Sequence, residues 1–150
     1  MRVVIQRVRQ SKVVIEGETK GEIGQGLNIL LGVENADSEE DADWLAAKIS
    51  SLRIFNDEND VMNLSINDVH GDALVISQFT LHARTKKGAR PSYVNAAKPD
   101  VAIPLYEYFV DRLKSLISGK VKTGVFGADM KVLIDNDGPV TILIDSKNKE

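Results

Sequence analysis

Groups that could do chemistry gather at one predicted strand end, Ser77-Gln78-Phe79-Thr80-Leu81. Hydroxyl, amide, aromatic and hydroxyl side chains follow one another here, directly after the apolar run of residues 73–76. Because a buried strand would end at this point, hydrogen-bonding side chains and backbone amides would be presented together. A structural interpretation is also open, since polar residues at a strand terminus can simply satisfy unpaired backbone groups.

A basic segment, residues 82–91, follows this strand end directly. It contains no acid and four formal positive charges, on Arg84, Lys86, Lys87 and Arg90. A solvated loop is one interpretation, and a loop that contacts phosphates is the other. The net charge of −3 argues against bulk adhesion to nucleic acid but not against a local patch. A polar strand end beside a basic loop would suit a phosphate-bearing substrate or an RNA end.

Several familiar kinds of site are excluded. There is no cysteine and no Gly-x-Ser-x-Gly segment, and His70 and His82 are the only histidines. His82 is expected in the charged loop, and nothing near either histidine suggests a catalytic triad or a metal centre. A hydrolase of this sequence would lack the usual general base. That leaves a binding module, or an enzyme whose substrate supplies part of the chemistry.

Residues 136–141 form a second unusual segment, Asn136-Asp137-Gly138-Pro139-Val140-Thr141, between apolar runs at 130–134 and 140–144. Asp-Gly between two such runs predicts a β-hairpin. Pro139 cannot donate a hydrogen bond where the returning strand should begin. Either the proline starts an edge strand, or this backbone serves a purpose other than turning.

The elements that must position these residues suggest an α+β fold. Helical periodicity predicts helices over residues 38–53 and 100–118, the first with Ser38 and Asp41 in a capping arrangement. Short connections favour antiparallel hairpins at 16–18 and 24–26. The expected architecture is a curved or barrel-like, mostly antiparallel sheet system with two main helices packed on it. The predicted strands span residues 2–8, 12–16, 27–33, 73–79, 121–126, 130–134 and 140–144.

Length and composition indicate an ordinary soluble globular protein. One domain spanning residues 1–150 is expected, with residues 146–150 a frayed tail. The apolar share of 43% and charged share of 27% are typical of this class. The absence of cysteine fits a reducing cytosol, and no signal peptide or membrane span is expected, so a cytoplasmic location is predicted.

The sequence resembles the D-aminoacyl-tRNA deacylase family over nearly its whole length. Tyr93 and Gly127 are minor departures, standing where phenylalanine and alanine are common in the family. The combination of SQFTL and NDGPVT at this spacing is highly specific. The matching segments, in family order, are Gln6-Arg7-Val8, Leu31-Gly32-Val33-Glu34, Arg53-Ile54-Phe55, Met62-Asn63-Leu64, residues 77–81, Gly88 with Arg90-Pro91-Ser92, Phe126-Gly127-Ala128-Asp129-Met130, and residues 136–141.

The resemblance implies an esterase acting on tRNA. Such an enzyme would hydrolyse D-aminoacyl-tRNA, and glycyl-tRNA mischarged on tRNA(Ala), while rejecting L-aminoacyl-tRNA. It would act in chiral proofreading on the aminoacylated 3′ end as a homodimer, with no cofactor, no metal, no membrane contact and no obligatory protein partner. The basic residues Arg84, Lys86, Lys87 and Arg90 would contact the tRNA.

The resemblance also assigns site residues. Gly138 and Pro139 would form a cis peptide that reaches into the partner subunit's pocket and selects chirality, while Phe126 and Met130 would hold the terminal adenosine. The catalytic strand end would comprise Ser77, Gln78, Phe79 and Thr80.

Two mechanisms compete at this strand end. In one, Thr80 is the nucleophile. In the other, the RNA's own 2′-hydroxyl does the chemistry while backbone amides near Phe79 and Thr80 polarise the carbonyl. A threonine hydroxyl without an adjacent base is a poor nucleophile. A backbone donor can supply about 3–4 kcal/mol without any titratable group. We therefore favour the second mechanism. A non-catalytic module that binds an RNA 3′ end or single strand is the alternative function.

Overall fold

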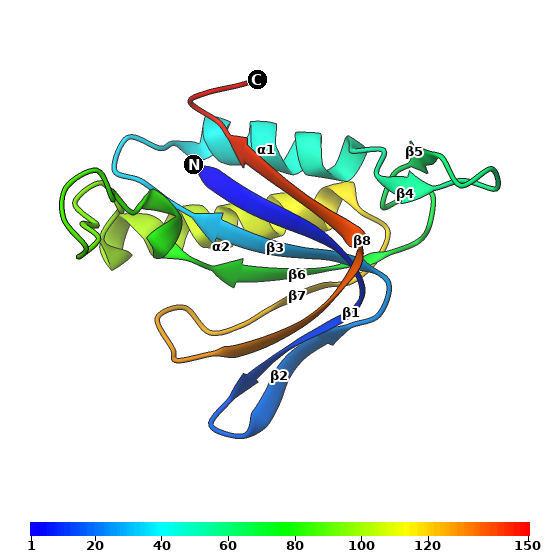
Figure 1. Cartoon of the computed structure of the whole chain (residues 1–150), viewed down its shortest axis with the longest axis horizontal. Coiled ribbons are helices and arrows are strands. Elements are labelled where there is room, and N and C mark those ends of the chain that lie inside the picture. The colour runs from blue at the N-terminus through cyan, green and yellow to red at the C-terminus, as the bar shows by residue number, and fades with distance from the viewer.

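Strand β1 (Arg2–Ile15) is a central strand of the sheet. The computed structural model describes residues 1–150. β1 pairs antiparallel with β2 (Glu18–Ile23), β3 (Gly26–Gly32) and β8 (Lys131–Asp145). Parallel pairs join β3 to β6 (Asp72–Ser77) and β6 to β7 (Val121–Thr123). β1 and β8 run side by side and bend together, from alongside the helices toward the end of the molecule where β2 lies (Figure 1). The predicted α+β class, with a curved and mostly antiparallel sheet, is confirmed.

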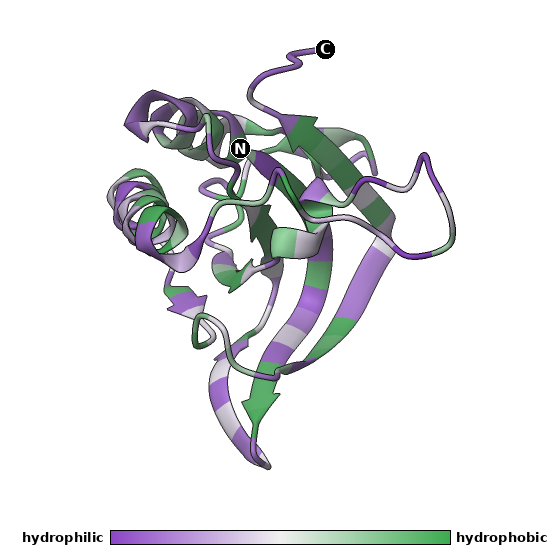
Figure 2. Cartoon of the chain, turned by 90° about the vertical axis from the view of Figure 1, so that its left-hand side faces the viewer, coloured by the Kyte–Doolittle hydropathy of each residue, from purple (hydrophilic) through white to green (hydrophobic).

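Two helices lie against this sheet, α1 (Glu39–Ser51) and α2 (Pro99–Leu116). The Ser38 N–H donates to the Asp41 carboxylate at 2.9 Å, which confirms the predicted capping arrangement. Both helices turn their hydrophobic side to the sheet and their hydrophilic side outward (Figure 2). No helix combines the length and the apolar character needed to cross a membrane.

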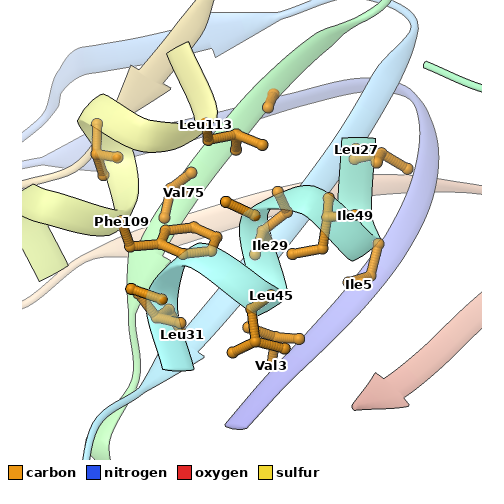
Figure 3. Close-up of a cluster of buried hydrophobic side chains, with 14 of the residues drawn as sticks. Val3, Ile5, Leu27, Ile29, Leu31, Leu45, Ile49, Val75, Phe109 and Leu113 are labelled. Atoms are coloured by element: carbon orange, nitrogen blue, oxygen red, sulfur yellow. The ribbon is translucent and has the colours of Figure 1, made fainter. Parts of the chain in front are cut away.

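The main core lies between the helices and the sheet. Leu45 and Ile49 of α1 and Phe109 of α2 pack over Ile29 and Val75 of the central strands (Figure 3). A smaller core on the other face contains Leu74 and Ile76 with Val8, Val13 and Ile23. β3 and β6 are therefore covered on both faces, as their nearly continuous apolar runs predicted.

The strand pairing differs from the prediction in two places. Residues 2–8 and 12–16 belong to the single long strand β1, not to two strands. The 16–18 connection makes the predicted hairpin, but 24–26 does not, because β3 pairs with β1 instead of β2. One edge of β1 is long enough to hold β3 along its first half and β2 along its second. Three short elements were not predicted: β4 (Phe55–Asn56), β5 (Met62–Leu64) and the 3₁₀ turn η1 (Phe79–His82).

The hairpin predicted at residues 136–141 is wrong. The two apolar runs do not pair with each other, because both pair with β1 within the continuous strand β8. Asn136 lies opposite Val8 and Thr141 lies opposite Gln6, so residues 137–140 form an extra loop in the strand, opposite Arg7. We call residues 137–140 the β8 bulge. In an ordinary β-bulge two residues face one on the neighbouring strand, and here four residues face one. The backbone of these four residues therefore leaves the plane of the sheet.

The C-terminal tail is anchored, in contrast to the frayed end that was expected. Ser146 is buried, and its hydroxyl accepts a hydrogen bond from the Met1 ammonium at 2.8 Å. The Lys147 ammonium donates to the Asp41 carboxylate at 2.8 Å, and the Lys149 ammonium lies 4.5 Å from the centre of the Trp44 ring. These contacts hold residues 146–149 against α1.

Asp41 joins the start of α1 to this tail. Burial by itself would raise the pKa of Asp41, but hydrogen bonds from Lys147 and the Ser38 N–H, among others, outweigh it and hold that pKa well below its ordinary value. A carboxyl with a depressed folded pKa stabilises the fold above its unfolded pKa of about 4 and loses this contribution as the pH falls toward the folded value.

Replacing Asp41 with asparagine should lower the melting temperature by a few degrees at pH 7, because the neutral amide loses these charge-assisted hydrogen bonds. The difference from wild type should shrink below pH ~4. Thermal unfolding followed by circular dichroism from pH 7 to pH 2 measures it. Asp111→Asn, at an exposed site on α2, is the control and should have little effect. A wild-type-to-variant difference that stays constant across this pH range would contradict the assignment.

Candidate functional site

A cavity of about 250 Å³ lies where β6 ends. Ser77, Gln78 and Phe79 line it from the strand end, and Phe126 and Met130 line it from the segment after β7. The structure thus brings together two sets of predicted site residues that are about fifty positions apart in the sequence. The other lining residues are mostly apolar: Leu31, Val33, Ile76, Ala97, Ala102, Tyr106, Gly127, Ala128, Asp129 and Val132.

The strand end presents free backbone donors. The Gln78 N–H still donates to the Leu31 carbonyl at 2.8 Å, which continues the parallel ladder of β3 and β6. The chain then turns into η1, whose first hydrogen bond within the turn is donated by the Leu81 N–H, so the preceding N–H groups of Phe79 and Thr80 have no acceptor within that turn and bond to no side chain or loop carbonyl. The first N–H groups of a helical turn have no acceptor within that turn. Two donors are therefore available beside an apolar cavity.

Thr80 is placed differently from the other three predicted catalytic residues. It does not line the cavity, and its hydroxyl oxygen accepts a hydrogen bond from the Gln78 side-chain amide at 2.6 Å. No hydrogen bond joins Thr80 to a histidine or a lysine. His82, expected in the exposed loop, is instead buried at the end of η1, with its Nδ1 3.8 Å from the Glu34 carboxylate. A base-activated threonine is not present in this arrangement.

Tyr106 of α2 was missed by the sequence reasoning. Its hydroxyl donates to the Val75 carbonyl at 2.8 Å, and its ring meets Phe126 edge to face with centroids 5.9 Å apart. Burial raises the pKa of Tyr106, so the phenol stays protonated and acts as a wall of the cavity. Its place in the apolar pattern of the helix predicts a core residue, and no other feature of the sequence distinguishes it from an ordinary core residue.

Gly138 and Pro139 are exposed and do not line the cavity of their own chain. The peptide bond between them is cis, as the family resemblance implies. Gly138 has φ +125°, which a residue with a side chain rarely adopts. The structure therefore separates these two residues from the other predicted site residues within one chain.

Arg7 holds the β8 bulge in place. Its buried guanidinium donates to the carbonyls of Asp137 (3.1 Å) and Ile54 (2.8 Å) and to the side chain of Asn56 (3.0 Å). On the other side, the Asn136 amide donates to the Arg7 carbonyl at 3.0 Å when its oxygen and nitrogen are assigned so that both find partners. Arg7 belongs to one of the segments that resemble the family, but nothing local in the sequence shows that it meets a segment 130 positions away.

Replacing Arg7 with glutamine should destabilise the protein by about 3 kcal/mol, because buried carbonyl acceptors lose a charged donor. Urea unfolding measures this difference. Arg9→Gln is the matched control: Arg9 approaches the Asp137 carboxylate at 3.6 Å, as Arg7 does at 3.4 Å, but it is 75% exposed, so its loss should cost under about 0.5 kcal/mol. Equal losses in the two variants would contradict the anchoring role of Arg7.

The four cationic residues of the 82–91 segment lie outside the cavity lining, on the exposed part of the chain that follows η1. None of Arg84, Lys86, Lys87 and Arg90 forms an ion pair within the chain. Backbone hydrogen bonds between Arg84 and Ser92, at 2.8 and 3.0 Å, close the base of the loop. No group of three or more carboxylate or imidazole side chains gathers anywhere in the chain to hold a metal ion.

Comparison with known proteins gives consistent matches. The family model described as D-Tyr-tRNA(Tyr) deacylase matches residues 4–145. Proteins named D-aminoacyl-tRNA deacylase from Flavobacterium johnsoniae and Phocaeicola vulgatus are 61% and 63% identical over 150 residues, and each match covers 100% of both chains.

Two solved structures have the same fold. One, named c-Myc DNA Unwinding Element Binding Protein, has a TM-score of 0.92 at 36% identity and covers 97% of this chain and 98% of its own. The other, from the structural analysis of a probable eukaryotic D-amino acid tRNA deacylase, has a TM-score of 0.79 at 17% identity and covers 95% and 97%. At that identity, the second likeness concerns the fold alone.

Proposed function

Since the chain belongs to the D-aminoacyl-tRNA deacylase family, we propose that the cavity beside β6 is where it hydrolyses the ester between a D-amino acid and the terminal adenosine of tRNA. The chain is a hydrolase that acts on carboxylic ester bonds of aminoacyl-tRNA, and its products are the free amino acid and tRNA. Phe126 and Met130 hold the adenosine in this proposal. The reacting carbonyl lies at Phe79, with the Ser77 and Gln78 side chains beside it. The enzyme works in the cytoplasm, where aminoacyl-tRNA is made and used.

The observation that carries this proposal is the position of the first two N–H groups of η1, on Phe79 at the wall of a mostly apolar cavity and on Thr80 directly after it. Donors of this kind stabilise the negative charge that develops on a carbonyl oxygen, and they act most strongly where water is excluded. The only carboxylate that lines the cavity, Asp129, is 88% exposed and paired with the Lys131 ammonium at 3.1 Å, which makes it a poor general base. The adenosine 2′-hydroxyl, next to the ester in the substrate itself, fills that role by relaying a proton during attack by water.

Chiral selection comes from a second copy of the chain in this proposal. Gly138 and Pro139 are exposed, anchored by Arg7, and separate from their own chain's cavity, which suits a segment that enters the cavity of a homodimer partner. Their carbonyls would face the substrate's amino group. A rigid wall at this point excludes the side chain of an L-amino acid by collision. Glycine has no side chain to collide, so glycyl-tRNA(Ala) is also cleaved.

Ester loss from D-tyrosyl-tRNA(Tyr), L-tyrosyl-tRNA(Tyr) and glycyl-tRNA(Ala) tests this function. We expect multiple turnover on the D-ester and the glycyl ester, and no acceleration on the L-ester. Equal rates on both enantiomers would contradict the selection model. Sedimentation of the purified protein tests the dimer, and a monomer that retains full selectivity would contradict the role of the partner.

A non-catalytic module that binds nucleic acid is the second candidate. The exposed cationic loop favours it, and so does the similarity to a protein that is named for binding a DNA unwinding element. Family membership favours the enzyme. The same assay separates the two, because a module would protect or ignore the ester, whereas the enzyme turns over many substrate molecules.

A further inference from the structure

Two exposed aromatic rings stand beside the cavity. Phe79 is 54% exposed and Tyr93 is 39% exposed. Their ring centroids are 5.0 Å apart and the ring planes meet at 71°, so the pair is edge to face. In this geometry one ring presents its edge to the face of the other, which leaves the remaining ring faces uncovered by the pair. Large aromatic side chains left open to water in this way suit a ligand with a flat face.

The backbone on both sides of this pair is held in place. Phe79 follows β6 closely and lines the cavity. Tyr93 follows Ser92, which closes the base of the basic loop, and the Tyr93 carbonyl accepts a hydrogen bond from the Ala96 N–H at 3.0 Å. The Ala97 N–H then donates to Val33 at 2.9 Å, next to β3. The ring pair thus joins a residue that lines the cavity to a residue next to the closed base of the loop.

The charges around this ring pair indicate the chemistry of its ligand. Arg84, Lys86, Lys87 and Arg90 are exposed and unpaired, and residues 82–91 contain no acid. Open aromatic faces next to unpaired cations are the combination that binds single-stranded nucleic acid, through stacking of bases and attraction of phosphates. An apolar protein partner would bury these cations without neutralising them, at a cost in free energy.

We propose that Phe79 and Tyr93 form a stacking platform for the base of the nucleotide that precedes the terminal adenosine, with the adjoining phosphates against the 82–91 loop. This rests on the proposed function, which places the terminal adenosine in the cavity. The preceding nucleotide is covalently joined to that adenosine, so it must lie at the mouth of the cavity, where the Phe79 ring is. Stacking accepts any base because every base has a π-face. The platform therefore contributes affinity for the tRNA end, whichever tRNA is bound.

Binding of deacylated tRNA(Tyr), with or without the base of the penultimate nucleotide, tests the platform in a double-mutant cycle. Removing that base should weaken binding to the wild-type protein about tenfold. The same removal should weaken binding to Tyr93→Ala by about threefold or less, because only the Phe79 ring of the platform remains. Tyr93→Phe keeps the ring and should behave as wild type, and circular dichroism confirms that each variant is folded.

Three outcomes would overturn the platform. The first is that removing the base has no effect on binding to the wild-type protein, and the second is that Tyr93→Ala weakens binding of both RNAs by the same factor. The third is a change in the number of subunits of Tyr93→Ala in sedimentation, which would assign the ring pair to a contact between two copies of the chain. Because binding is measured without ester hydrolysis, a wild-type protein that binds as expected but cleaves no D-tyrosyl-tRNA would refute the proposed function and leave the platform supported.

Discussion

A D-aminoacyl-tRNA whose terminal adenosine lacks the 2′-hydroxyl should be hydrolysed at least about a hundredfold more slowly than the normal substrate, whereas Thr80→Ala should keep its rate within about tenfold of wild type. The Thr80 hydroxyl oxygen already accepts a hydrogen bond from Gln78, and no base in the chain is placed to take its proton. The backbone N–H groups of Phe79 and Thr80 survive the substitution, so in the proposed mechanism the carbonyl would still be polarised.

Single-turnover hydrolysis of a D-tyrosyl ester on normal and on 3′-terminal 2′-deoxy tRNA measures both effects. The rate of spontaneous hydrolysis of each ester, without protein, is the reference, because the deoxy ester also differs in intrinsic reactivity. An inactive Thr80→Ala protein together with normal cleavage of the deoxy substrate would refute the substrate-assisted mechanism and restore Thr80 as the nucleophile.

Replacing Gly138 with alanine should reduce activity on D-aminoacyl-tRNA by about a hundredfold or more, because small misplacements of a positioning group have effects of this size. A Cβ at this position would lie 2.9 Å from the Val140 side chain and 3.0 Å from the Arg7 guanidinium. The backbone φ of +125° is also strained for any residue with a side chain. The β8 bulge must therefore shift, and its carbonyls with it.

Gly17→Ala is the matched control for this substitution. Gly17 also has a positive φ, +79°, but it lies in an exposed turn with no atom within 4 Å of the added Cβ. This control should lose about 1 kcal/mol of stability and retain its activity. Steady-state kinetics with urea unfolding on both variants separates strain from misplacement. If Gly138→Ala kept wild-type turnover and selectivity, the β8 bulge would have no part in the site.

Much of the fold could be read from local patterns. The 3.6-residue period of Leu45 and Ile49 predicted α1, and the apolar runs around Ile29 and Val75 predicted strands covered on both faces. Ser38 and Asp41 marked the start of α1, since a capping arrangement involves residues only three apart. In each case the residues that interact are neighbours in the sequence or in one element.

Pairing between distant segments was predicted less well. The Asp137-Gly138 signal is local and indicates a turn, but both halves of β8 pair with β1 and not with each other. The tail provides a second example, because nothing within residues 146–150 shows that Lys147 will meet Asp41. Tertiary contacts of this kind override a local preference worth about 1 kcal/mol.

The sequence by itself determined the residue types of the site. The polar strand end at 77–80, the Gly138-Pro139 segment, the basic loop and the absence of the usual general base are all visible in the chain, and they leave either a binding module or an enzyme whose substrate supplies part of the chemistry. The tertiary structure alone decided that Phe126 and Met130 meet that strand end, that Arg7 anchors the β8 bulge, and that Phe79 and Tyr93 stand together beside the cavity. The physical reason is that side-chain chemistry and periodicity are local properties, whereas the surfaces that a sheet and two helices bury against each other depend on the whole chain.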